Sequence, residues 1–161
     1  MGQSKPLRAT ALIVEDDAMQ REILCVLLEE SDYHVIQCES AEAAELVIDE
    51  VGGRLSLLMT DVNLAGRKSG VELAHIAKAR NPRLDVVVTS GRPLSEQLPD
   101  GAKFWSKPWA ALDVLREAEI AQGMVEKGMA GKRMVESDSE AVMGRKREAR
   151  HRVGLTPDPS N

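Results

Sequence analysis

Short apolar runs rich in β-branched residues alternate along this chain with stretches of helical periodicity. Strands that alternate with helices in this way are typical of βα units, whose strands lie parallel in one sheet. The pattern therefore predicts an α/β fold with five parallel strands. The runs predicted as strands are Ala9–Val14, His34–Gln37, Leu55–Thr60, Asp85–Thr89 and Lys103–Ser106.

The segments between the strands carry apolar residues at helical spacing. Ser40 and Ser69 stand where helix N-caps are expected, and the second begins a capping box with Glu72. The predicted helices are Ala18–Glu30, Ala41–Val51, Val71–Arg80 and Ala110–Ala121. The residues predicted to face the core are Met19, Ile23, Val26 and Leu27 in the first helix, and Leu112, Val114, Leu115 and Ala118 in the last.

The fourth connection, from Ser90 to Lys103, differs from the others. It contains two prolines and two glycines, which interrupt helices. We expect at most one helical turn there, around Ser95–Leu98, and therefore a shortened fourth helix.

Reactive polar residues follow the ends of the predicted strands. They are Glu15, Asp16, Asp61, Thr89 and Lys107. In a parallel sheet these ends share one edge, where α/β proteins bind ligands. Clustered carboxylates repel one another unless a cation is present, and hard oxygen ligands favour Mg²⁺ or Mn²⁺. Each residue alone has an ordinary explanation as a cap, turn residue or surface charge, but together they predict a metal-assisted phosphoryl site in which Asp61 attacks phosphorus.

With these residues in order, the chain resembles the receiver domain of two-component response regulators, the CheY-like family. The resemblance covers residue 8 to about residue 121. The matching segments are Ala11–Asp17, Leu58–Asn63, Val87–Gly91 and Phe104–Trp109. It implies a flavodoxin-like, doubly wound sheet in the order 2-1-3-4-5. It also implies that Asp61 accepts a phosphoryl group from a histidine kinase or a histidine phosphotransfer protein.

The resemblance further implies roles for individual residues. Asp16, Asp61 and the backbone carbonyl of Asn63 would hold Mg²⁺, and Glu15 would act through water. Thr89 and Lys107 would contact the acyl phosphate, Phe104 stands at the position of an aromatic switch, and Asp17 is an adjacent helix cap. Phosphorylation would draw Thr89 inward, give Phe104 room to move, and so change the surface that a downstream protein binds.

The loop after Asn63 departs from the family pattern. It reads Leu64–Ser69, is about one residue longer than usual, and has Ala65 where the family commonly has proline. We expect this difference to affect partner choice more than the central chemistry.

The rest of the chain carries weaker signals. The net charge is −5, with an acidic body and a mildly basic end. We expect a flexible segment over 1–7, a receiver domain over 8–123, and a polar, mildly basic and largely disordered tail over 124–161. Cys25 and Cys38 match no metal or redox spacing, so both are predicted to be reduced packing residues. No apolar stretch approaches the roughly 20 residues that span a membrane, and no secretory segment is visible, so we expect a cytoplasmic protein.

Three functions are compatible with these patterns. The first is a stand-alone receiver, a signalling module and not an enzyme. The second is a phosphatase like those of the haloacid dehalogenase superfamily, although that resemblance requires an Asp where this chain has Asn63. The third is a regulator that binds DNA through its tail. The sequence does not identify the donor kinase, the downstream partner, the phosphoryl lifetime or the oligomeric state.

Overall fold

A five-stranded parallel sheet lies at the centre of the computed structural model, which describes residues 8–123. The strand order is β2-β1-β3-β4-β5, and each neighbouring pair is parallel. The strands are β1 (Thr10–Val14), β2 (His34–Cys38), β3 (Leu55–Asp61), β4 (Asp85–Ser90) and β5 (Lys103–Ser106). The predicted fold class and strand order are confirmed. The predictions for 1–7 and 124–161 concern residues outside the described range.

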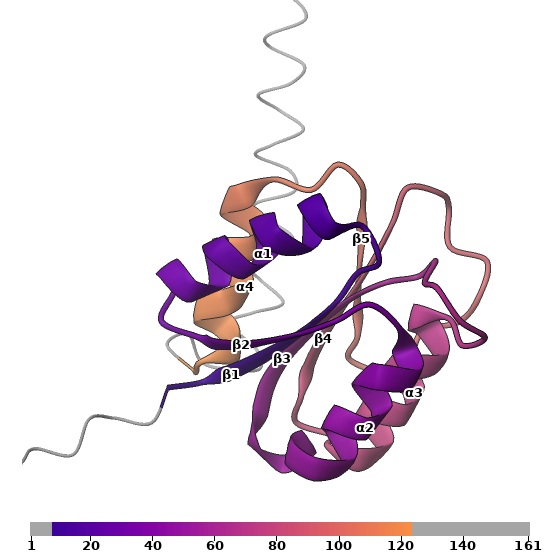
Figure 1. Ribbon diagram of the computed structural model, residues 1–161, viewed down its shortest axis with the longest axis horizontal. Helices are drawn as coiled ribbons and strands as arrows, with labels where there is room; N and C mark the ends of the chain where they lie inside the picture. Colours follow the sequence, from indigo (N-terminus) through magenta and orange to yellow (C-terminus); the bar gives the residue numbers. More distant parts are fainter. Residues whose placement is uncertain (1–7, 124–161) are drawn as a thin grey trace, which may run out of the picture. The chain divides into compact units, whose positions relative to one another are not determined.

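Helices cover both faces of the sheet. Figure 1 shows α2 and α3 together on one face, and α1 and α4 on the other. The helices are α1 (Ala18–Glu30), α2 (Ala41–Val51), α3 (Gly70–Arg80) and α4 (Ala111–Ala121), and a short 3₁₀ turn, η1 (Gly52–Arg54), precedes β3. The predicted N-caps are confirmed, because the Ser40 and Ser69 side chains accept backbone N–H groups of Ala43 and Glu72 at 3.2 Å each.

The strands supply two separate core layers, because successive side chains point to opposite faces of the sheet. Leu12, Leu58 and Val88 belong to the layer under α2 and α3. Ile13, Met59 and Val87, which are their neighbours in sequence, belong to the layer under α1 and α4. This burial on both faces explains why the strands read as continuous apolar runs.

The predicted inward face of α1 is wrong for three of its four residues, whereas the fourth, Leu27, packs against the core layer under α1 and α4. Met19 is 75% exposed, and Ile23 and Val26 are each 47% exposed. The helix buries Leu24 and Leu28, together with Cys25 between them in sequence. The apolar residues of α1 form two stripes around the helix, and spacing alone does not tell which of them contacts the sheet.

The last helix also differs from its prediction at one position. Val114 and Ala118 are buried as predicted, but Leu112 is 66% exposed. A charged residue takes a buried place instead: Glu117 is 4% exposed, and both its oxygens lie 2.9 Å from the Lys103 ammonium. The ion pair with β5 thus favours an orientation of α4 that apolar spacing could not indicate.

The connection between β4 and β5 contains no helix within residues 91–102. At most one helical turn was predicted for it, and the chain instead follows an irregular path. Pro99 accepts the N–H of Ala102 at 3.1 Å in a turn, next to Gly101 with a φ of +82°. Leu94 and Leu98 pack against the core layer under α2 and α3. Two leucines therefore cover an edge of the core that a regular helix would otherwise protect.

The two cysteines are buried in different core layers, Cys25 under α1 and α4 and Cys38 under α2 and α3. Their exposed fractions are 7% and 8%. Burial raises the pKa of both thiols. Both are free, buried side chains, as predicted for packing residues. Within residues 8–123, no helix has the length and apolar character needed to cross a membrane.

Candidate functional site

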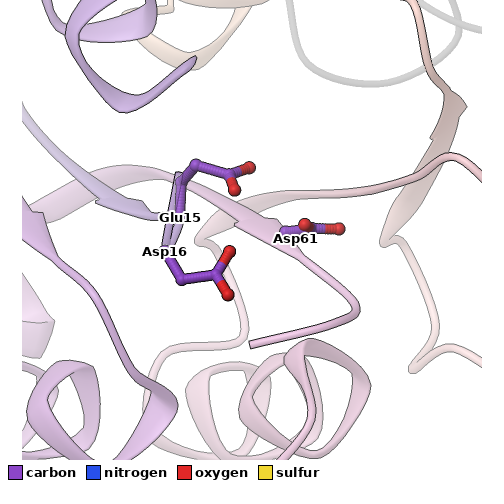
Figure 2. A group of neighbouring side chains, drawn as sticks. All are labelled: Glu15, Asp16 and Asp61. Carbon is purple, nitrogen blue, oxygen red and sulfur yellow. The ribbon is translucent and has the colours of Figure 1, made fainter. Parts of the chain in front are cut away.

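Three carboxylates meet at the carboxyl edge of the sheet. Glu15, Asp16 and Asp61 each place an oxygen within 4.8 Å of the others. Figure 2 shows the three side chains next to one another, with Glu15 and Asp16 just after β1 and Asp61 at the end of β3. The register explains this, because Val14 pairs with Thr60 across neighbouring parallel strands, so the residues that follow them are brought side by side. Glu15 and Asp61 are 2% and 8% exposed, whereas Asp16 is exposed to solvent.

Lys107 reaches this group from the loop that follows β5. Its ammonium lies 3.1 Å from Glu15 Oε2 and 3.1 Å from Asp61 Oδ2. The backbone N–H of Lys107 donates to the Ser90 carbonyl at 2.8 Å, which fixes the loop to the end of β4. The peptide bond to Pro108 is cis. Lys107 is thus held between the two buried carboxylates.

The charges in this site are only partly compensated. Burial raises the pKa of Glu15, and the neighbouring Asp61 carboxylate adds to the effect, whereas hydrogen bonds from Asp17 N–H and Lys107 oppose it. Burial disfavours the charged form of Lys107, but its hydrogen bonds to the two carboxylates prevail and raise its pKa. One ammonium beside three carboxylates leaves an excess of negative charge when all are ionised. A divalent cation would remove this excess.

The other predicted site residues, Thr89, Phe104 and Asn63, lie on β4, on β5 and in the loop after β3. Thr89 pairs with Asp61 in the register of β3 and β4, and it is 3% exposed. Phe104 is half-buried on β5, where it pairs with Val88. Asn63 is exposed in the loop two residues beyond Asp61. The structure therefore brings Thr89 next to the acidic group, and the predicted roles of Asn63 and Phe104 remain predictions.

Comparison with known proteins agrees with this geometry. The family model described as the response regulator receiver domain matches residues 11–105. The chain belongs to this receiver family.

Solved structures with the same fold include several receivers. The receiver domain of the hybrid histidine kinase CckA has a TM-score of 0.62 and 25% identity, and the match covers 70% of this chain and 98% of that one. A receiver protein from Sinorhizobium medicae has a TM-score of 0.64 at 19% identity, with 71% of this chain and 94% of that one covered. At that identity the second likeness shows the fold alone.

A curated relative is much longer than this receiver. A cyclic di-GMP phosphodiesterase of Thermotoga maritima is 37% identical over 81 residues, which are 50% of this chain and 21% of that protein. This chain therefore spans about a fifth of the length of that relative. The name of the relative describes the whole protein, so it does not assign an activity to the receiver.

Arg21 contacts the loop of Glu15, Asp16 and Asp17 that follows β1, and the sequence did not predict this contact. Its guanidinium donates to the Glu15 carbonyl at 2.8 Å and lies 3.5 Å from Glu39. The Asp17 carboxylate accepts the Gln20 N–H at 2.9 Å, which confirms Asp17 as the cap of α1. The sequence signal was a single basic residue one turn into the helix, which spacing could not distinguish from a solvated one.

Gly70 is a second residue whose importance only the structure reveals. A Cβ atom built on Gly70 would lie 1.8 Å from the Asp61 carbonyl oxygen. The Gly70 N–H donates to the Val62 carbonyl at 2.9 Å, so α3 begins directly against the end of β3. Only glycine permits this approach, which places the first turn of α3 next to the backbone of Asp61.

Proposed function

We propose that this chain is a phosphorylation-controlled response regulator that accepts a phosphoryl group on Asp61. The donor is the phosphohistidine of a histidine kinase or a histidine phosphotransfer protein. The observation that carries the proposal is the meeting of Asp61 with Glu15, Asp16 and Lys107 at the ligand-binding edge of the sheet. A buried carboxylate beside both a cation and further acids has the surroundings that a phosphoryl acceptor needs.

The donor atoms fit a magnesium ion. Asp16, Asp61 and the Asn63 carbonyl would hold Mg²⁺, or Mn²⁺, with Glu15 acting through water. All are hard oxygen donors, and no His or Cys belongs to the acidic group within the described residues. A solved structure of the same fold, at 17% identity to this chain, is that of the CheX–CheY–BeF₃–Mg²⁺ complex from Borrelia burgdorferi. When bound, Mg²⁺ would stabilise the negative charge that spreads over the phosphoryl oxygens.

In the proposed transfer, an Asp61 carboxylate oxygen attacks phosphorus. The P–N bond of the phosphohistidine breaks, and its electron pair remains on the imidazole nitrogen. Lys107, which contacts Asp61 at 3.1 Å before the reaction, pairs with a phosphoryl oxygen afterwards. The Thr89 hydroxyl, next to Asp61 in the sheet, donates a hydrogen bond to another phosphoryl oxygen.

The proposed switch starts from Thr89. When the hydroxyl of Thr89 moves toward the phosphoryl group, it leaves space that the half-buried Phe104 ring fills. The surface over β4, β5 and residues 91–102 then changes and binds a downstream protein differently. The phosphorylated state is favoured because only that state contains the new dianion for Thr89 and Lys107 to bind.

The direct test is phosphorylation with acetyl phosphate. In the presence of Mg²⁺, intact-mass spectrometry should show the addition of one phosphoryl group, and peptide mapping should place it on Asp61. The label should be absent after removal of the metal with EDTA and absent in Asp61→Asn. The control Asp100→Asn, at an exposed carboxylate outside the site, should be labelled like the wild type. Full labelling of Asp61→Asn would reject the assignment.

The two other functions have less support. A phosphatase of the haloacid dehalogenase type needs a general acid two residues after its nucleophile, and Asn63 cannot supply a proton in that way. Turnover of p-nitrophenyl phosphate that depends on Asp61 would favour that function. DNA binding through 124–161 concerns residues outside the described range. We also propose a cytoplasmic location, because the ATP that histidine kinases consume is found there.

A further inference from the structure

The loop from β3 to α3 lies against the beginning of α2. One oxygen of the Glu42 carboxylate accepts two successive backbone N–H groups, from Arg67 at 2.8 Å and from Lys68 at 2.9 Å. The Lys68 ammonium also pairs with Glu45, one turn further along α2. The loop therefore contacts α2 through both its backbone and a side chain.

Glycine is required where this loop passes the Glu42 carboxylate. Gly66 has a φ of +97°, which side chains rarely allow. A Cβ atom there would also lie 2.6 Å from Glu42 Oε2. That second oxygen is buried and accepts no hydrogen bond from the described residues. The carboxylate is thus packed tightly against the turn, and a loop that merely had to be solvated would not need this arrangement.

The same loop carries the proposed carbonyl ligand of the metal. Asn63 lies between Asp61, which ends β3, and the segment that Glu42 holds. The sequence lacks the proline that commonly stiffens this loop in the family and has Ala65 instead, which makes an isolated bridge with Ser40 just before α2. A contact with α2 therefore supplies the order that the loop's own composition does not.

We propose that Glu42 is a positioning residue that sets the Mg²⁺ affinity of this receiver, because it fixes the backbone that presents the Asn63 carbonyl. The inference rests on the proposed function, since it assumes that Mg²⁺ binds at the acidic group. Glu42 acts from outside that group and touches neither the metal ligands nor Asp61.

The charge of Glu42 strengthens the contact. Its pKa is lowered, first by the hydrogen bond from Lys68 N–H and then by other backbone N–H groups. The side chain is therefore ionised at neutral pH, and hydrogen bonds to an ionised acceptor are about twice as strong as neutral ones. Glu42 also stands in the first turn of α2, where a negative charge favours the helix.

Three substitutions separate these contributions. Glu42→Ala removes the acceptor, Glu42→Asp keeps the charge but withdraws it from the loop, and Glu42→Gln keeps an oxygen that can accept both N–H groups. The matched control is Glu45→Ala, which removes the neighbouring acid of α2 and its pair with Lys68 but leaves the backbone contacts in place.

The first measurement is the Mg²⁺ affinity of each variant, obtained from the change of its backbone amide NMR shifts during titration with Mg²⁺. Loss of a residue that orients a metal ligand typically weakens metal binding by about 10-fold to 100-fold, and we expect the lower end for Glu42→Ala and Glu42→Asp because the loop is partly exposed. Glu42→Gln should be intermediate, and Glu45→Ala should stay within about twofold of the wild type. At saturating Mg²⁺, Asp61 of the control Glu45→Ala should be labelled at the wild-type rate.

The second measurement needs no metal. In EDTA, hydrogen exchange of the Arg67 and Lys68 amides should be faster in Glu42→Ala and Glu42→Asp but unchanged in Glu45→Ala. If acetyl phosphate and Mg²⁺ do not label Asp61 of the wild-type protein, the proposed function itself is wrong. If the wild type is labelled and Glu42→Asp exchanges faster yet binds Mg²⁺ as tightly as the wild type, the positioning role of Glu42 is wrong.

Discussion

Replacing Gly70 by alanine tests how closely α3 must approach the backbone of Asp61. The added Cβ would stand 1.8 Å from the Asp61 carbonyl oxygen and 2.9 Å from the Thr60 hydroxyl. A carbon and a carbonyl oxygen normally stay about 3.3 Å apart, so α3 or β3 must shift by roughly 1.5 Å. Neither neighbour can move away easily, because the Asp61 carbonyl is backbone in a central strand and the Thr60 side chain is buried.

The loss of stability that this shift causes can be estimated from other proteins in which a carbon was added to a packed core. Forcing one extra carbon into a packed interior destabilises a protein by about 1–3 kcal/mol, and occasionally by more. We place Gly70→Ala at or above the upper end, because the clash is with backbone. For a domain of this size, each 1 kcal/mol lowers Tm by roughly 3–6 °C, so we expect a decrease of about 10–15 °C. The shift also moves Asp61, so labelling by acetyl phosphate should be slower in the protein that remains folded.

The matched control for this prediction is Gly53→Ala. A Cβ atom at Gly53 would meet nothing within 4 Å, so the same chemical change adds no contact there. Both variants should be compared with the wild type by thermal unfolding and by the rate of labelling at 25 °C. If Gly70→Ala unfolds at the temperature of Gly53→Ala, the close approach of α3 to β3 does not limit the domain, and the reasoning is refuted.

Two further predictions concern the charges of the site. Lys107→Ala should leave the domain folded, but Glu15 and Asp61 then face each other without their ammonium partner. Urea unfolding in EDTA should therefore show a free energy of unfolding lower by about 1–3 kcal/mol, and Mg²⁺ should partly restore it. Equal stability with and without Lys107 would contradict the assigned charge balance. Glu15 has a pKa raised above its ordinary value of 4.5, so its contribution to the stability of the metal-free domain is complete below about pH 4.5 and is lost as the pH rises through the raised pKa. Wild-type protein should therefore lose stability relative to Glu15→Gln as the pH rises above about 4.5, and a difference that stayed flat or grew in the other direction would show that the sign is wrong.

Sequence patterns predicted the parts of this structure that depend on neighbours in sequence. The strand ends are within one residue of their predicted places, because an apolar run followed by a polar residue marks where a strand leaves the core. The grouping of Glu15, Asp16, Asp61 and Lys107 followed from the same feature, since parallel strands bring their carboxyl ends to one edge.

The features that the sequence did not reveal depend on contacts between distant segments. The buried face of α1 was misplaced, because two apolar stripes compete and only packing against the sheet selects Leu24 and Leu28. The roles of Gly70 and Glu42 were missed for the same reason. Glu42 meets its partners 25 and 26 residues later in the chain, and nothing in the local pattern around Glu42 distinguishes it from a solvated helix residue.

The contacts outside the acidic group show where this site is rigid. Apart from Asp61, which ends β3, the proposed ligands and Lys107 lie in three loops. Each loop is held by a group that does not itself react. Arg21 holds the Glu15 carbonyl, Glu42 holds the loop after Asn63, and the Ser90 carbonyl holds the N–H of Lys107. Under the proposed function, a site supported in this way would need little rearrangement of its own backbone to bind a metal and a phosphoryl group. The structural change on phosphorylation should therefore be found mainly at Thr89, Phe104 and residues 91–102, where the connection between β4 and β5 is irregular.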